Sequence, residues 1–191
     1  MLQYKITRSA IAAISLNLVI TLLFATTLKA QQVLGLERLR NAIHGGHFYT
    51  TDPREVYDHV RGAGFVHEGS LGVCISRKTQ DTTALYRLVK PGQDRLYTIY
   101  SEEVESAKRS GYFYENVPCY VYRSYSRVSP CEIYRLYNPK KNYHFYTTDK
   151  READSAMRIG YRYEDSQGFL RAGRYNLNGD RCVVDQVNLI K

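Results

Sequence analysis

Two histidines and one arginine hold equivalent places in a repeated hexapeptide, and their side chains are suited to acid–base chemistry. The run HFYTTD occurs at residues 47–52 and again at residues 144–149, and a diverged form, RLYTIY, occupies residues 95–100. If His47, Arg95 and His144 face one axis, two imidazoles and a cation can support general acid–base cleavage of a phosphodiester. A small ribonuclease that uses His47 and His144 is therefore one hypothesis.

The neighbouring hydroxyl groups argue against this hypothesis. Phosphoesterases with two His-x-Thr/Ser motifs need a hydroxyl two residues after the histidine, on the same face of the strand. Tyr49 and Tyr146 hold that place here, whereas Thr50 and Thr147 come three residues after the histidine and point to the opposite face. Catalytic residues are also usually unique, whereas these residues recur. We therefore expect structural or ligand-binding histidines and no enzymatic activity.

The hexapeptide belongs to a longer repeat with a period of 48 to 49 residues. An arginine precedes each copy, and two glutamates separated by a glycine follow it. Equal numbers of recurrent arginines and glutamates favour ion pairs over arginines that bind an acidic polymer. The first glutamates are explained by helix capping, so the second set provides the better partners. The recurrent positions are Arg38, Arg87 and Arg135, then Glu55, Glu103 and Glu152, then Gly64, Gly111 and Gly160, and finally Glu68, Glu115 and Glu164.

Each repeat has the pattern of two strands, a helix and a third strand. The hexapeptide and the segment before it are short, aromatic and bounded by turn residues, as strands are. Residues 52–55 and 149–152 match capping boxes that begin short helices, and the recurrent glycines end them. An alternating strand follows, for example at residues 161–164.

One such repeat cannot bury its apolar face alone, so three must pack together. We predict an α+β fold of three β-β-α-β repeats of about 48 residues with approximate threefold symmetry, preceded by a signal peptide. The repeats cover about residues 33–78, 82–124 and 130–173, and a C-terminal tail follows them. An open stack of three repeats is the alternative arrangement.

The first 30 residues have the layout of a secretory signal peptide. Two cations precede an apolar stretch over residues 10–25, which is shorter than the roughly 20 residues that a spanning helix needs. Cleavage after Ala30 removes three cations and lowers the formal charge from +8 to +5. An uncleaved anchor is the alternative. We expect a secreted domain of residues 31–191 with no stable membrane insertion after cleavage and no nucleic acid as a partner.

Secretion changes the interpretation of the four cysteines. An even number of cysteines in an oxidising compartment favours two disulfides, and the absence of a CxxC pair argues against a metal site. Four cysteines allow three pairings, of which we favour Cys119 with Cys131 and Cys74 with Cys182. The motifs of nucleotide loops and common hydrolases are missing as well, so we expect neither a cofactor nor a metal.

The 18 tyrosines, in a chain without tryptophan, divide into two groups. The first group recurs in at least two repeats and is expected in the core, where its hydroxyls need partners. The second group is unrepeated, and nothing obliges it to be buried. Exposed tyrosines beside basic residues would suit sugars or acidic polymers, although hinge packing is the alternative. The recurrent group is Tyr49, Tyr97, Tyr112, Tyr146 and Tyr161, and the unrepeated group is Tyr120, Tyr122, Tyr125 and Tyr143.

The order of YRLYN, a polar turn, HFYTTD, a helix with a glutamate, a glycine with an aromatic residue and a second glutamate resembles the DUF5648 repeat family. The resemblance covers about residues 36–170, and the repeat around His144 is its clearest copy. The first repeat departs at Glu37, and the second departs at Arg95 and Tyr100. The family occurs in secreted proteins, often beside hydrolytic or adhesive domains, so the resemblance implies a fold and a secreted setting.

Together these observations predict a secreted, non-catalytic module that recognises an extracellular polysaccharide, or other glycan, or a protein surface. An extracellular-matrix structural protein and a small secreted ribonuclease are the alternatives. The expected ligand-binding residues are His47, Arg95, His144, Tyr120, Tyr122, Tyr125 and Tyr143.

Overall fold

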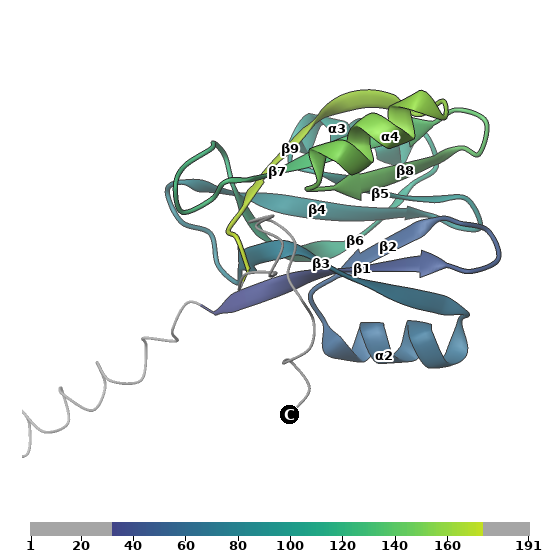
Figure 1. Ribbon diagram of the computed structural model, residues 1–191, viewed down its shortest axis with the longest axis horizontal. Helices are drawn as coiled ribbons and strands as arrows, with labels where there is room; N and C mark the ends of the chain where they lie inside the picture. The colour runs from purple at the N-terminus through teal and green to yellow at the C-terminus, as the bar shows by residue number, and fades with distance from the viewer. Residues whose placement is uncertain (1–31, 174–191) are drawn as a thin grey trace, which may run out of the picture. The chain divides into compact units, whose positions relative to one another are not determined.

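The computed structural model describes residues 32–173, in which the order strand, strand, helix, strand occurs three times (Figure 1). The first unit is β1 (Val33–Asn41), β2 (His47–Thr50), α2 (Pro53–Gly62) and β3 (Phe65–Ile75). The second unit is β4 (Thr82–Lys90), β5 (Asp94–Thr98), α3 (Ser101–Arg109) and β6 (Phe113–Tyr122). The third unit is β7 (Cys131–Asn138), β8 (Tyr143–Thr147), α4 (Lys150–Arg158) and β9 (Arg162–Leu170).

The predicted α+β class is wrong, because the described chain is mostly antiparallel β structure. Strands hold 50% of the described residues and the three short helices only 20%. The third strand of each unit is 9 to 11 residues long and continues well beyond the short alternating run that the sequence pattern marks. The predicted signal peptide, residues 1–30, and the tail after residue 173 lie outside the described residues.

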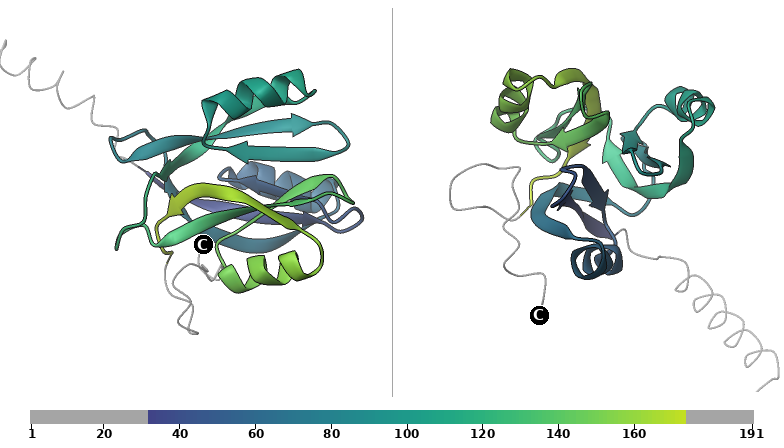
Figure 2. Two further views of the ribbon diagram at one scale, coloured as in Figure 1. Left: turned by 90° about the horizontal axis from the view of Figure 1, so that it is seen from above. Right: turned by 90° about the vertical axis from the view of Figure 1, so that its right-hand side faces the viewer.

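Each unit is a three-stranded antiparallel arrangement with a helix on its outer side (Figure 2). The first strand pairs with the second through a tight turn and with the third on its other edge. The units join where their third strands end, through the pairs Ile75–Tyr120 and Tyr122–Phe169.

Within residues 32–173, no helix is both long enough and apolar enough to cross a bilayer.

The recurrent tyrosines of the second strands form the centre of the core. Tyr49, Tyr97 and Tyr146 are 1%, 1% and 2% exposed, and their rings meet edge-on at centroid distances of 5.2 to 5.4 Å. The Tyr97 hydroxyl donates to the Tyr49 carbonyl at 2.7 Å and accepts from the Tyr49 N–H at 2.9 Å. Tyr146 binds Tyr97 in the same way, and Tyr49 binds Tyr146, so three hydroxyls close a ring.

Ion pairs between recurrent arginines and glutamates surround this ring. Arg87 of the second unit donates through both Nη atoms to Glu55 of the first unit, at 2.8 and 2.9 Å, and its Nε lies 2.9 Å from Glu115 of its own unit. The predicted pairing of arginines with glutamates is confirmed, but the expectation that the second set provides the better partners is wrong. Glu55, of the first set, accepts from both Nη atoms of Arg87 and from the Thr50 hydroxyl, while Asp52 caps the helix. The equivalent pairs are Arg135 with Glu103 and Glu164, and Arg38 with Glu152 and Glu68.

The disulfide pairing favoured from the sequence is wrong. Cys74 of β3 is bonded to Cys119 of β6, with their Cα atoms 6.0 Å apart. The reason is the pairing of the adjacent residues, Ile75 and Tyr120, which brings the two cysteines together. Cys131 is also disulfide-bonded, and Cys182 lies outside the described residues.

We predict that Tyr97→Phe destabilises the protein by about 1–3 kcal/mol, because the change leaves a buried N–H and a buried carbonyl of Tyr49 without their partner. Urea unfolding followed by circular dichroism, with the disulfides intact, measures this loss. Tyr125→Phe is the matched control, because the Tyr125 side chain is 67% exposed. This substitution should change the free energy of unfolding by no more than a few tenths of a kcal/mol. Equal stability of the two variants would contradict the role given to the hydroxyl ring.

Candidate functional site

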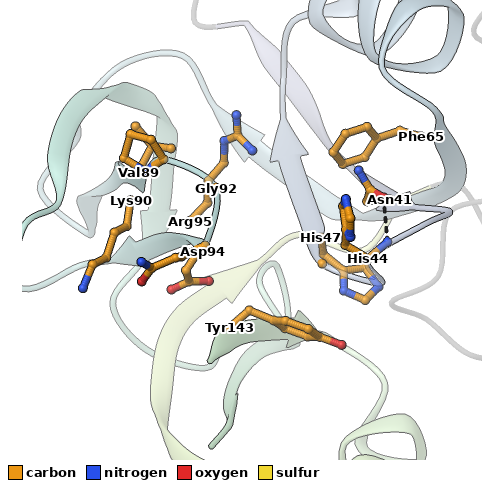
Figure 3. Close-up of a pocket in the computed structure, with 13 residues that line it drawn as sticks. Asn41, His44, His47, Phe65, Val89, Lys90, Gly92, Asp94, Arg95 and Tyr143 are labelled. Carbon is orange, nitrogen blue, oxygen red and sulfur yellow. Dashed lines mark hydrogen bonds between the residues drawn. The ribbon is translucent and has the colours of Figure 1, made fainter. Parts of the chain in front are cut away.

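The turns that join the first two strands of each unit lie at one end of the molecule (Figure 1), and residues of all three units line a pocket there of about 430 Å³ (Figure 3). We call this end the turn end. Most of the pocket wall comes from the first and second units. The lining residues are Asn41, His44, Gly46, His47 and Phe65 of the first unit, residues 89–95 of the second unit, and Tyr143 of the third unit.

The predicted ligand-binding residues do not form one site. His47, Arg95 and Tyr143 line the pocket, and His144 follows Tyr143 on β8. The remaining tyrosines lie towards the opposite end, as the register of β4 shows: Val89 pairs with Arg95, and Thr82 pairs with Tyr122. Seven residues of strand separate these pairs by about 23 Å.

The unrepeated tyrosines also differ in exposure. Tyr125 is 67% exposed, whereas Tyr120 and Tyr122 are half-buried parts of β6. Tyr143, expected in an exposed turn, is only 6% exposed, and its hydroxyl accepts from Tyr161 at 3.0 Å. The expectation of one exposed tyrosine surface is therefore wrong, because the turns pack against one another at the turn end.

His47 is held by an acidic side chain of its own unit. Its Nε2 lies 3.3 Å from Glu68, which also contacts Arg38 at 3.0 Å and Arg40 at 2.8 Å. Burial alone would raise the pKa of Glu68, but the hydrogen bond from His47 and the charge of Arg38 outweigh burial and lower this pKa to about 2. Glu68 is thus ionised at neutral pH and keeps the imidazole in place.

His144 is held by two carboxylates. Its Nδ1 lies 2.5 Å from Asp94 and its Nε2 lies 3.2 Å from Glu164, while its backbone N–H donates to Asp94 at 2.9 Å. Burial alone would lower the pKa of His144, but the two carboxylates raise it to about 9. Tyr112 donates a further hydrogen bond to Asp94 at 2.8 Å. His144 is therefore protonated at neutral pH and cannot act there as a general base.

Arg95 is the least engaged of the three equivalent side chains, His47, Arg95 and His144. Its Nε lies 3.8 Å from Glu115, and its guanidinium stacks on the Phe48 ring at 4.7 Å. Lys90 also lines the pocket, but its Nζ lies 5.6 Å from the centre of the Tyr112 ring and points away from Arg95 (Figure 3). The carboxylate of the wall, Asp94, is already bound to His144. The pocket can therefore bind an anionic or hydrogen-bonding ligand. Within residues 32–173, no group of three or more His, Cys, Asp and Glu side chains is arranged to hold a metal ion.

Apart from His47, Arg95 and Tyr143, the lining residues were not predicted from the sequence, and they include His44, Gly46 and Lys90. His44 and Gly46 belong to a turn that has no recurrent motif, and Lys90 is the last residue of β4. The signal that would have found Gly46 is the comparison between repeats, because this glycine stands where the other units have Asp94 and Tyr143.

The protonated His144 gives a testable pH dependence. Because its pKa in the folded chain, about 9, exceeds the ordinary value of 6.5, the stabilisation is complete below pH 6.5 and is lost as the pH rises through about 9. We predict that the free energy of unfolding falls by up to about 3 kcal/mol between pH 6 and pH 9. Urea unfolding across this range measures the fall.

The matched control is His144→Arg, because arginine holds the equivalent position in the second unit and does not titrate in this range. Its stability should change much less between pH 6 and pH 9. A slope as steep as that of the unchanged chain would show that another group titrates.

Comparison with known proteins identifies a family but no individual relative. No curated protein and no solved structure matches the chain. The model of a family described as a domain of unknown function, DUF5648, matches residues 23–122, just over half of the 191 residues. These residues include the first two units and both turns that form most of the pocket wall. The chain therefore belongs to the DUF5648 family.

Proposed function

We propose that this chain is a secreted, non-catalytic binding module that recognises an extracellular polysaccharide through the pocket at the turn end. The observation that carries the proposal is a pocket of about 430 Å³ that is lined by the cation Arg95 together with polar and aromatic side chains. A volume in this range suits one or two sugar rings and is typical of small-ligand sites, not of flat protein interfaces.

The chemistry of the wall supports a sugar ligand. Asn41 and Gln93 bring planar amides, and Phe65 and Tyr143 bring aromatic rings to the same pocket. Polar groups that fix orientation beside apolar and aromatic surface are what ligand pockets generally combine. The Asn41 side chain is itself held rigid, because its oxygen accepts two backbone N–H groups of its own turn, at 2.9 Å each.

The carboxylate contacts of the two histidines favour binding over hydrolysis. His144 donates to Asp94 and Glu164, and His47 contacts Glu68. A two-histidine nuclease needs one neutral imidazole as its base at working pH, and a pKa of about 9 at His144 opposes that state.

The disulfide supports secretion. A Cys74–Cys119 bond forms and persists in an oxidising compartment, in agreement with the signal-peptide pattern of residues 1–30. Polysaccharides are abundant ligands outside the cell, so the proposed location and ligand class are compatible.

A glycan array with the full chain tests the proposal. We predict retention on at least one polysaccharide and a loss of affinity of tenfold or more for Arg95→Ala, because a hydrogen bond to a charged group is worth about 1.5–3 kcal/mol. Tyr125→Ala, at the opposite end, is the matched control and should bind normally. Silence across neutral and acidic glycans would overturn the proposal, and a loss confined to Tyr125→Ala would overturn the placement of the site.

A further inference from the structure

The three units differ at the residue that starts or precedes each second strand, directly before His47, Arg95 or His144. The register of the three turns aligns these positions, since Arg40 pairs with His47, Val89 with Arg95, and Tyr137 with His144. The preceding residue is Gly46 in the first unit, Asp94 in the second and Tyr143 in the third.

Two of the three contacts between units are filled by this side chain. Between the second and third units, the Asp94 carboxylate accepts from the backbone N–H of His144 at 2.9 Å and contacts the His144 ring at 2.5 Å. Between the third and first units, Tyr143 is 94% buried, and its hydroxyl would lie 3.4 Å from a Cβ placed on Gly45. Both side chains therefore reach across to the next unit.

The contact between the first and second units has no such side chain. Gly46 stops at its Cα, and a Cβ placed there would meet no atom within 4 Å. Phe65 of the first unit stands at the position that Tyr112 holds in the second unit. Phe65 has no hydroxyl, so the hydrogen bond from Tyr112 to Asp94 has no counterpart in the first unit. The pocket lies at the place that an Asp94-like side chain would fill (Figure 3).

We infer that the pocket binds a carboxylate in the place that Asp94 takes at the next contact, and that the carboxylate belongs to a uronic acid residue of the polysaccharide. The backbone N–H and guanidinium of Arg95 correspond to the backbone N–H and ring of His144. The identification of the uronic acid rests on the proposed function, whereas the preference for a carboxylate rests on the equivalence between units.

Electrostatics within the pocket agree with this ligand. The contact from Arg95 to Glu115 is 3.8 Å, whereas the equivalent contacts from His47 and His144 are 3.3 and 3.2 Å. A ligand carboxylate would thus meet a cation that is weakly engaged inside the protein. One carboxylate oxygen on the Arg95 N–H and the other on its guanidinium would repeat the arrangement of Asp94 on His144, and a charged donor strengthens the second hydrogen bond.

The substitution Gly46→Asp supplies the carboxylate from within the chain. Gly46 is outside the set of glycines with positive φ, and its Cβ position is open, so the backbone accepts a side chain there. The new carboxylate should pair with Arg95, occupy the pocket and raise the thermal midpoint slightly. Gly62→Asp is the matched control, because Gly62 ends α2 outside the pocket lining, also has no positive φ and also has an open Cβ position, so it adds the same charge away from the pocket.

Calorimetric titration of the full chain with hexagalacturonate and with its methyl ester measures the preference for the carboxylate. We expect the acid to bind at least tenfold more tightly than the ester, Gly46→Asp to lose this binding and Gly62→Asp to keep it. Equal affinity for the acid and the ester would overturn the carboxylate and leave polysaccharide binding standing. Normal binding by a folded Gly46→Asp variant would overturn the assignment of the pocket.

Acetate provides a probe that does not depend on the polysaccharide. Titration with acetate should shift the Arg95 amide resonance in the heteronuclear NMR spectrum of the unchanged chain, and not in that of Gly46→Asp. This shift without any glycan binding would overturn the proposed function and retain the carboxylate site. Absence of both the shift and of uronate binding would overturn the inference itself.

Discussion

The ring of three tyrosine hydroxyls is the interaction on which the rest of the structure depends. Each hydroxyl of Tyr49, Tyr97 and Tyr146 binds both backbone polar groups of the tyrosine in a neighbouring unit. These backbone groups belong to buried strands, so they would otherwise be costly to leave without partners. The ring satisfies them, sets the order of the units and joins the third unit back to the first. The aromatic side chains that fill the core are thus also the groups that link the three units.

Around this constant centre, the units differ where they face one another at the turn end. A carboxylate fills one contact, a phenol ring fills another, and a glycine leaves the third open. Because the hydroxyl ring and the arginine–glutamate pairs hold the units together, a single position can lose its side chain without loss of the fold. Gly46, which has no side chain to fill its contact between units, therefore leaves a space beside the weakly engaged Arg95. Divergence between repeats, more than the repeat itself, explains the candidate site.

Much of the framework could be predicted from the sequence, because recurrence marks residues that every unit needs. The tyrosine core and the arginine–glutamate pairs follow from positions that repeat, and the helices begin beside Asp52 and Asp149, which cap them. The class of the fold could not be predicted in the same way, since the third strands extend beyond their recurrent residues. The disulfide depends on the contact of Cys74 with Cys119 across two units, which spacing along the chain does not encode. The open space at Gly46 could not be predicted from recurrence, because Gly46 differs from its counterparts in the other two units.

We infer that a ligand carboxylate takes, beside Arg95, the place that Asp94 takes beside His144. A crystal structure of the full chain soaked with galacturonate would show this placement. We expect one carboxylate oxygen within hydrogen-bond distance of the Arg95 N–H and the other on its guanidinium. A sugar bound near Tyr125, or a sugar in the pocket that turns its hydroxyls to Arg95 and its carboxylate to solvent, would contradict it.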